Sequence, residues 1–286
     1  MQGNIIELLF QTEKVRGSSF VVASRFYWGG VPDKASKFFI FDTNHKTMLN
    51  NLDFSKIIFI DIETVPAVYH FSELDERGKE LWDKKTRFLQ DREGISPAQV
   101  YEKAGIYSEF AKVACISIGI VVRKDGEEQI RLKSFAGTDE KKLLQEFADM
   151  INSKFAHPSY LLCAHNGKEF DFPFLSRRFL INGLRLPEML NIAGKKPWEI
   201  NHLDTMELWK FGDYKNYTSL ELLTYVFDIP TPKDDIDGSQ VASVFYEEGD
   251  IDRIITYCEK DVIATVQLMR KYCLLPLIHD DFILST

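Results

Sequence analysis

Several features that mark particular classes of protein are missing from this sequence. No apolar run approaches the ~20 residues of a membrane span, and the first residues, MQGNIIELLF, lack a basic segment before a long apolar core. Neither a transmembrane helix nor a signal peptide is therefore predicted. The four cysteines form no C-x-x-C pair and lie in apolar segments, which argues against a zinc site and fits reduced thiols. These absences predict a cytoplasmic protein that does not bind membranes.

Positive charge is also scarce. The chain has 35 Lys and Arg against 43 Asp and Glu, a net charge of -8. Proteins that cover long stretches of duplex nucleic acid are usually basic, because they neutralise many phosphates. The net negative charge of this chain argues against such an extended contact with nucleic acid. It leaves room for a small site that binds one strand end through metal ions, since the ions supply the positive charge.

The first 47 residues differ in charge from the rest of the 286-residue chain. They carry six basic and four acidic residues, a net charge of +2, which leaves a net charge of -10 for the remainder of the chain. Met48 then opens MLNNLDFSKIIFIDIET, which is typical of a natural start. We predict that residues 1–47 are an N-terminal extension, or a mis-assigned start, whose structure the pattern does not define. Residues 48–286 are predicted to form the functional domain.

Strands and helices alternate in this second part. Apolar runs predict strands over residues 56–63, 113–122, 128–136, 160–166 and 199–205. Helices are predicted within 72–110, over 139–155, from about 172 to 183, and over 250–275. In the 72–110 segment, the apolar residues at helical spacing are Leu74, Leu81, Trp82, Phe88 and Leu89. One hairpin among interleaved elements predicts an α/β fold, a mixed sheet with helices on both faces. The 72–110 segment is either a wall over a substrate path or a decoration of the fold.

Two carboxylates interrupt the isoleucine-rich strand IIFIDIETVP at residues 57–66. Asp61 and Glu63 are two residues apart on a strand and therefore project to the same face, opposite Ile60 and Ile62. They come at the predicted carboxyl end of the strand, where open α/β sheets bind ligands. Two carboxylates this close suit a hard divalent ion, which would offset their repulsion. The alternative is a strand end that simply becomes polar at the surface.

Two further segments carry acidic residues. In HNGKEFDFPFL (165–175), Asp171 opens a helix beside Phe170; the alternative is an ordinary helix cap after an Asn166–Gly167 turn. In YCEKD (257–261), Tyr257 and Asp261 are four residues apart and share one helix face. The alternative there is an ordinary helix with an exposed Asp.

Four carboxylates from these segments could act together. If Asp61, Glu63, Asp171 and Asp261 converge, they can hold two divalent cations, Mg²⁺ or Mn²⁺, about 3.5–4 Å apart, the arrangement used for in-line phosphoryl displacement. A tyrosine one turn before the last Asp can orient the attacking water.

The sequence resembles a known family, the DEDD superfamily of 3′–5′ exonucleases, which have a ribonuclease H-like fold. The resemblance lies in the three motifs of that superfamily, which are matched here by FIDIET, HNGKEFDFPFL and YCEKD. The histidine branch of the superfamily has a His at the position of Thr256. Tyr257 therefore places the resemblance in the tyrosine branch, which includes the proofreading domains of family B DNA polymerases. The sequence is most similar to the stand-alone proteins described as predicted family B polymerase-like exonucleases, over about residues 54–275.

This resemblance implies a mixed five-stranded sheet flanked by helices, and a role for each motif residue. The implied metal ligands are Asp61, Glu63, Asp171 and Asp261. Glu63 would also approach the terminal 3′-hydroxyl, and Tyr257 would orient the nucleophilic water. The backbone near Thr64, with Asn166 and Phe170, would hold the terminal nucleotides.

The resulting prediction is a metal-dependent 3′–5′ exonuclease that acts on single-stranded 3′ ends, with DNA favoured over RNA. One alternative is an RNA exonuclease of the same fold, because nothing in the motifs reads the 2′-hydroxyl. Another is a nucleic-acid-binding module that keeps the carboxylates without turnover. Of the nearby polar residues, Asp204 is predicted to be a helix cap and His165 a hydrogen-bonded, non-ligating histidine.

Overall fold

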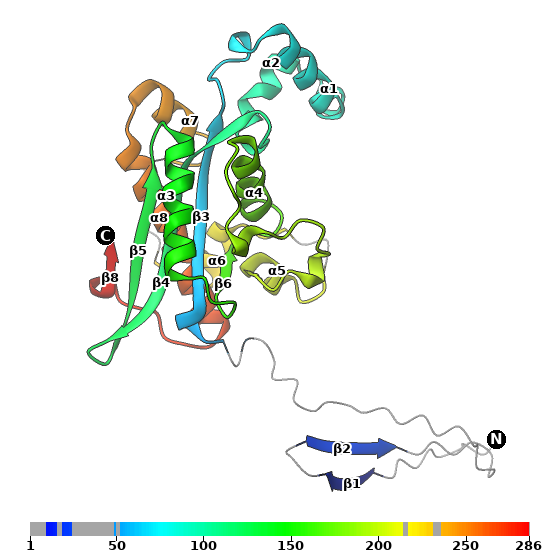
Figure 1. Cartoon of the computed structure of the whole chain (residues 1–286), viewed down its shortest axis with the longest axis vertical. Coiled ribbons are helices and arrows are strands. Elements are labelled where there is room, and N and C mark those ends of the chain that lie inside the picture. The colour runs from blue at the N-terminus through cyan, green and yellow to red at the C-terminus, as the bar shows by residue number, and fades with distance from the viewer. Residues whose placement is uncertain are drawn as a thin grey trace, which may run out of the picture. The chain divides into compact units, whose positions relative to one another are not determined.

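The computed structural model describes residues 10–15, 19–24, 49, 52–213, 217–230 and 236–285 (Figure 1). The chain divides into two compact units, Met1–Leu52 and Asp53–Thr286. In the first unit, strands β1 (Phe10–Val15) and β2 (Ser19–Ser24) pair antiparallel. The rest of the predicted extension lies outside the described residues.

The predicted domain start at Met48 can be tested directly. Because the second unit begins at Asp53, a chain that starts at Met48 is expected to fold and to unfold in one cooperative transition. Thermal unfolding followed by circular dichroism would check this. A shortened chain that fails to fold would show that residues 1–47 belong to the functional domain.

The second unit is built on one mixed sheet with strand order β7-β6-β3-β4-β5-β8. Its strands are β3 (Ile57–Pro66), β4 (Ala111–Lys124), β5 (Glu127–Ala136), β6 (Leu161–Ala164), β7 (Leu203–Asp204) and β8 (Ile283–Ser285). Strands β3, β4 and β5 pair antiparallel, whereas β6, β7 and β8 each join a neighbour in parallel. The predicted mixed α/β sheet is confirmed. It has six strands instead of five, because three residues near the chain end add β8 at the edge.

Helices cover both faces of this sheet. The described residues contain helices α1 (Glu76–Glu93), α2 (Pro97–Val100), α3 (Glu140–Lys154), α4 (Asp171–Ile181), α5 (Thr205–Lys210), α6 (Leu220–Val226), α7 (Val241–Ser243) and α8 (Ile251–Tyr272), of which α1 and α2 lie away from the sheet (Figure 1). A π-helical turn at Val244–Glu248 follows α7, and 3₁₀ turns lie at Phe54–Lys56, Phe71–Glu73, Tyr101–Ile106, Glu188–Leu190, Pro197–Glu199 and Asp280–Phe282. Within the described residues, no helix is long and apolar enough to cross a membrane.

The alternation of β3 sets which side chains face which helices. Ile58, Ile60 and Ile62 are buried in a core cluster with residues of α3 and α4. Val65, on the other face of the strand, packs with Cys258 and other residues of α8. Figure 1 shows α3 in front of the sheet and α8 behind it. The prediction that the isoleucines oppose the two carboxylates is confirmed, and the carboxylates therefore face α8.

The helical segment between β3 and β4 has a small core of its own. Trp82 is fully buried, with its ring edge-on to those of Tyr101, Tyr107 and Phe110. Its indole N–H donates to the Pro97 carbonyl oxygen at 2.8 Å. The predicted helices are confirmed, but two residues of the proposed apolar stripe, Leu81 and Phe88, are exposed. The small core around Trp82 does not cover the part of α1 that carries Leu81 and Phe88.

A buried ion pair ties this segment to the main fold. The Glu140 carboxylate accepts hydrogen bonds from Arg178 Nε and Nη2, the Val113 N–H and Asn182 Nδ2, at 2.6–2.8 Å. Arg178 Nη1 donates to the Ser108 carbonyl oxygen at 2.8 Å. The pair therefore joins α3, α4, β4 and the end of the helical segment.

Glu140→Gln is expected to lower the free energy of unfolding by about 3 kcal/mol, because the Arg178 charge would stay buried without its partner. Denaturant unfolding would measure the loss. Glu146→Gln is the matched control, since Glu146 lies on the same helix and is 3.9 Å from Lys142 in an exposed pair. That change should stay within about 0.5 kcal/mol. Equal losses in the two variants would contradict the prediction.

Candidate active site

Strand β3 presents Asp61 and Glu63 to the α8 side of the sheet. They are its fifth and seventh residues of ten, so the prediction that they end the strand is wrong. Beyond Glu63 the strand continues to Pro66, paired with β4 after a register shift between Glu63 and Thr64. Its pairing with β6 stops at Phe59. The carboxylates therefore lie beyond the end of β6, where no strand of the described residues pairs with that edge of β3.

A tight loop after β6 delivers Asp171. Asn166 has a left-handed backbone, with φ of 64°. The N–H groups of Asn166 and Lys168 each donate to the Asp204 carboxylate at 3.0 Å. A Cβ on Gly167 would lie 2.4 Å from the Ala164 Cβ, so only glycine fits this turn. Asp204 also caps α5 through the Met206 and Glu207 N–H groups, which confirms its predicted role as a cap.

Asp171 is the first residue of α4, and Phe170 takes the cap position. The alternative that Asp171 is an ordinary cap is therefore wrong. The side chain is almost fully buried, 3% exposed, which is unusual for a carboxylate. The loop between β6 and α4 sets the position of Asp171.

Helix α8 supplies the remaining predicted residues. Tyr257 and Asp261 are half-buried and one turn apart. A Cβ on Gly238 would lie 3.9 Å from the Tyr257 hydroxyl oxygen. The hydroxyl therefore lies close to the backbone of the segment before α7.

The four carboxylates act on one another electrostatically. Burial, then the charges of Asp261, Glu63 and Asp171, raise the pKa of Asp61 well above its ordinary value. Burial and the charges of Asp261 and Asp171 also raise the pKa of Glu63. For Asp171, burial with the charges of Asp204 and Asp261 raises the pKa to about 7, although backbone hydrogen bonds oppose the rise. Asp61, Glu63, Asp171 and Asp261 therefore lie close enough for their charges to affect one another.

This cluster fits a hard divalent cation. In the part of the chain that is described, neither Asp61, Glu63 nor Asp171 forms an ion pair with a lysine or arginine. Buried carboxylates without a counter-ion are costly. Carboxylate oxygens held on a strand and two helices are the ligands that Mg²⁺ and Mn²⁺ prefer.

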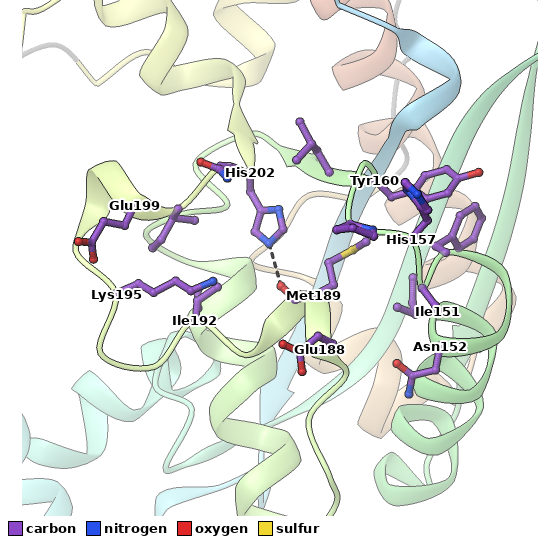
Figure 2. Close-up of a pocket in the computed structure, with 16 residues that line it drawn as sticks. Ile151, Asn152, His157, Tyr160, Glu188, Met189, Ile192, Lys195, Glu199 and His202 are labelled. Carbon is purple, nitrogen blue, oxygen red and sulfur yellow. Dashed lines mark hydrogen bonds between the residues drawn. The ribbon is translucent and has the colours of Figure 1, made fainter.

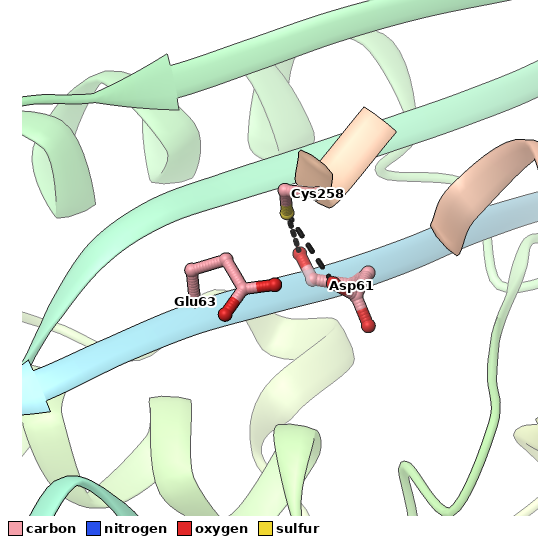
Figure 3. A group of neighbouring side chains, drawn as sticks. All are labelled: Asp61, Glu63 and Cys258. Carbon is pink, nitrogen blue, oxygen red and sulfur yellow. Dashed lines mark hydrogen bonds between the residues drawn. The ribbon is translucent and has the colours of Figure 1, made fainter. Parts of the chain in front are cut away.

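Cys258 is a residue that sequence reasoning missed. Its apolar sequence surroundings predict only a reduced thiol. Its Sγ donates to the backbone oxygen and to Oδ2 of Asp61, each at 3.4 Å. Ligand atoms of Asp61, Glu63 and Cys258 all lie within 4.8 Å of one another (Figure 3). Burial raises the pKa of the Cys258 thiol, so the sulfur is protonated and can donate.

Of the residues predicted to bind substrate, Thr64 follows Glu63 in β3, Phe170 precedes Asp171, and Asn166 lies in the loop between β6 and α4. The Thr64 hydroxyl donates to the Gly105 carbonyl oxygen at 2.7 Å, so its side chain is already engaged. The buried Asn166 Oδ1 finds no hydrogen-bond partner among the described residues. Phe170 is half-buried, with its ring 5.3 Å from that of Phe174.

His165 does not join this group as a ligand. Its two ring nitrogens lie 2.9 Å from the Thr205 hydroxyl and 3.0 Å from the Thr218 carbonyl oxygen. Burial lowers its pKa, so the ring is neutral. The prediction of a hydrogen-bonded, non-ligating histidine is confirmed.

A pocket of about 270 Å³ lies elsewhere, between the end of α3, the start of β6 and the 188–202 segment (Figure 2). None of the predicted site residues lines it. His202 within it is engaged on both nitrogens, by the Leu162 N–H and the Met189 carbonyl oxygen. The loop to Asp171 leaves from the opposite end of β6, so this pocket is separate from the carboxylates.

No curated protein matches the chain. Residues 107–278, more than half of the chain, match a family described as predicted 3′–5′ exonuclease related to the exonuclease domain of PolB. The match contains Asp171, Tyr257 and Asp261, and begins after Asp61 and Glu63. Strand β3, which carries these two residues, pairs with β4 and β6, and both of these strands lie within the match. The chain therefore belongs to this family of predicted 3′–5′ exonucleases.

Proposed function

We propose that this protein is a metal-dependent 3′–5′ exonuclease that hydrolyses phosphodiester bonds at the 3′ ends of single-stranded DNA. The observation that carries the proposal is the convergence of four carboxylates, three of which have raised pKa values through burial and mutual repulsion. A fold that keeps such a cluster without lysine or arginine partners for Asp61, Glu63 and Asp171 is suited to binding cations.

Asp61, Glu63, Asp171 and Asp261 would hold two divalent cations, Mg²⁺ or Mn²⁺, which supply the charge that activates water and stabilises the leaving oxygen. The chain's own contribution is placement. Strand β3 and two helices fix the oxygens, because rigid elements hold a site more closely than loops do. The Tyr257 hydroxyl orients the attacking water by hydrogen bonding.

The surroundings of the site support action at a strand end. Gly105 approaches so closely that a Cβ there would lie 3.3 Å from the Thr64 carbonyl oxygen. The helical segment therefore packs against β3 immediately after Glu63 and favours the interpretation of this segment as a wall. Glu63 would approach the terminal 3′-hydroxyl. Asn166, Phe170 and the backbone at Thr64 would hold the terminal nucleotides, with a base stacked on Phe170.

The test uses 5′-labelled single-stranded DNA and the matching RNA, each with Mn²⁺, Mg²⁺ or a chelator. A descending ladder that requires metal and is lost in Asp61→Asn would establish the exonuclease. Asp139→Asn is the matched control, because this exposed cap of α3 changes the same atoms outside the cluster. Faster cleavage of RNA would make the protein an RNA exonuclease. A folded protein that binds Mn²⁺ and yields no ladder would be a non-catalytic binding module.

Tyr257→Phe should slow hydrolysis by about 100-fold, because only the orientation of the water is lost. Affinity for Mn²⁺ should be unchanged, since the carboxylates remain. Tyr272→Phe serves as control: that hydroxyl is on the same helix and donates to the Thr205 carbonyl oxygen. Steady-state rates and calorimetric Mn²⁺ titration would separate the two effects. Equal rates for the two variants would exclude a role for Tyr257.

A further inference from the structure

The Cys258 side chain lies where α8 packs against the sheet. It is fully buried and lies between Tyr257 and Asp261 on the helix. Its sulfur reaches two oxygens of Asp61, the backbone carbonyl and Oδ2, both at 3.4 Å (Figure 3). For the residues that the structure describes, no other hydrogen-bond donor reaches the Asp61 carboxylate.

Asp61 needs such a donor because its neighbours repel it. The charges of Asp261, Glu63 and Asp171 all act on it, as its raised pKa shows after the larger effect of burial. Asp61 is also the less buried of the two β3 residues. The single S–H proton is shared between the backbone oxygen and Oδ2 of Asp61, which restrains Oδ2 and leaves Oδ1 available.

A thiol suits this position better than a hydroxyl. The sulfur belongs to an apolar cluster that includes Val65, Ala114 and Ile254. Buried cysteine behaves as a small apolar residue with a weak donor, so it can pack in this cluster and still bond to Asp61.

We propose that Cys258 is a positioning residue whose S–H group holds the Asp61 carboxylate in the orientation that binds the divalent cation. The inference rests on the proposed function, because it assumes that Asp61 is a metal ligand. Cys258 acts through Asp61 and is not itself a ligand, since its proton is used in the bonds to Asp61 and hard cations prefer oxygen.

The test compares Cys258→Ala and Cys258→Val, which lack the donor, with Cys258→Ser, which keeps one. The valine variant keeps the site filled should the alanine variant not fold. Cys163→Ala is the matched control, because Cys163 is also fully buried but lies on strand β6. Mn²⁺ affinity of the full chain, measured by calorimetry, is the main readout. Thermal unfolding in chelator reports any general loss of stability.

We expect Mn²⁺ affinity to fall about 10-fold or more in the donor-less variants, the usual effect of removing a group that orients a ligand. The serine variant should recover part of it, and Cys163→Ala should match the wild type. Equal affinity in the donor-less variants and in Cys163→Ala would overturn the proposal. So would a thiolate charge-transfer band in the Co²⁺-loaded wild type that disappears in Cys258→Ser, because that would make Cys258 a ligand. A wild type that binds Mn²⁺ but cleaves no strand would overturn only the proposed function.

Discussion

Asp61→Asn is expected to reduce hydrolysis of single-stranded DNA by at least about 1,000-fold, which corresponds to about 4 kcal/mol of transition-state stabilisation. The amide keeps the shape of the side chain but removes its charge, so the site loses a quarter of the carboxylates proposed to hold the cations. Measurement at saturating Mn²⁺ would show whether the loss is in affinity or in rate. Retention of more than a tenth of the wild-type rate would contradict the assignment of Asp61.

The same change should stabilise the metal-free protein. At pH 8 the charges of the cluster repel one another, and removing one relieves Glu63 and Asp171. A gain of about 1 kcal/mol would raise the melting temperature by about 2–4 °C in a domain of this size. Thermal unfolding in chelator would measure it, with Asp139→Asn as the unchanged control. A variant that is both less active and less stable would point to a general structural defect.

The alternation in β3 and the helical spacing in α8 were readable from the sequence because both are local periodicities. They correctly placed the isoleucines on the face opposite the carboxylates, and the structure shows that the isoleucines pack against α3 and α4. The extent of β3 was not readable, since the strand continues past Glu63 only through an irregular pairing with β4. That pairing depends on partners at least 45 residues away, from Pro66 with Ala111 to Thr64 with Val113, and no local pattern reports it.

Tertiary contacts explain what else sequence reasoning missed. The role of Cys258 arises because α8 passes β3 at Asp61, 197 residues earlier in the chain. Likewise, the ion pair of Glu140 with Arg178 joins residues 38 apart on separate helices. The convergence of the carboxylates was expected through the resemblance to exonucleases, whereas composition and spacing alone left each motif with an ordinary alternative.

The second large effect concerns pH. Burial, with the charges of Asp204 and Asp261, raises the pKa of Asp171 from 3.8 to about 7 in the folded protein. Between these values the folded state binds a proton that the unfolded state has lost, so stability falls as the pH rises. The contribution is fully present below about pH 4 and lost above about pH 7. At 1.36 kcal/mol per unit it amounts to about 4 kcal/mol. The raised pKa values of Asp61 and Glu63 act in the same direction.

In chelator, the melting temperature should therefore decline between pH 5 and pH 8, and Asp171→Asn should flatten the decline. Divalent cations compete with these protons, so Mn²⁺ should raise the melting temperature more at pH 8 than at pH 5.5. Thermal unfolding across this range, with and without Mn²⁺, checks both expectations. Asp139→Asn should follow the wild-type curve, because its carboxylate lies on the surface. A metal-free protein that gains stability up to pH 8, or an Mn²⁺ effect independent of pH, would show that the four carboxylates are not the cation site.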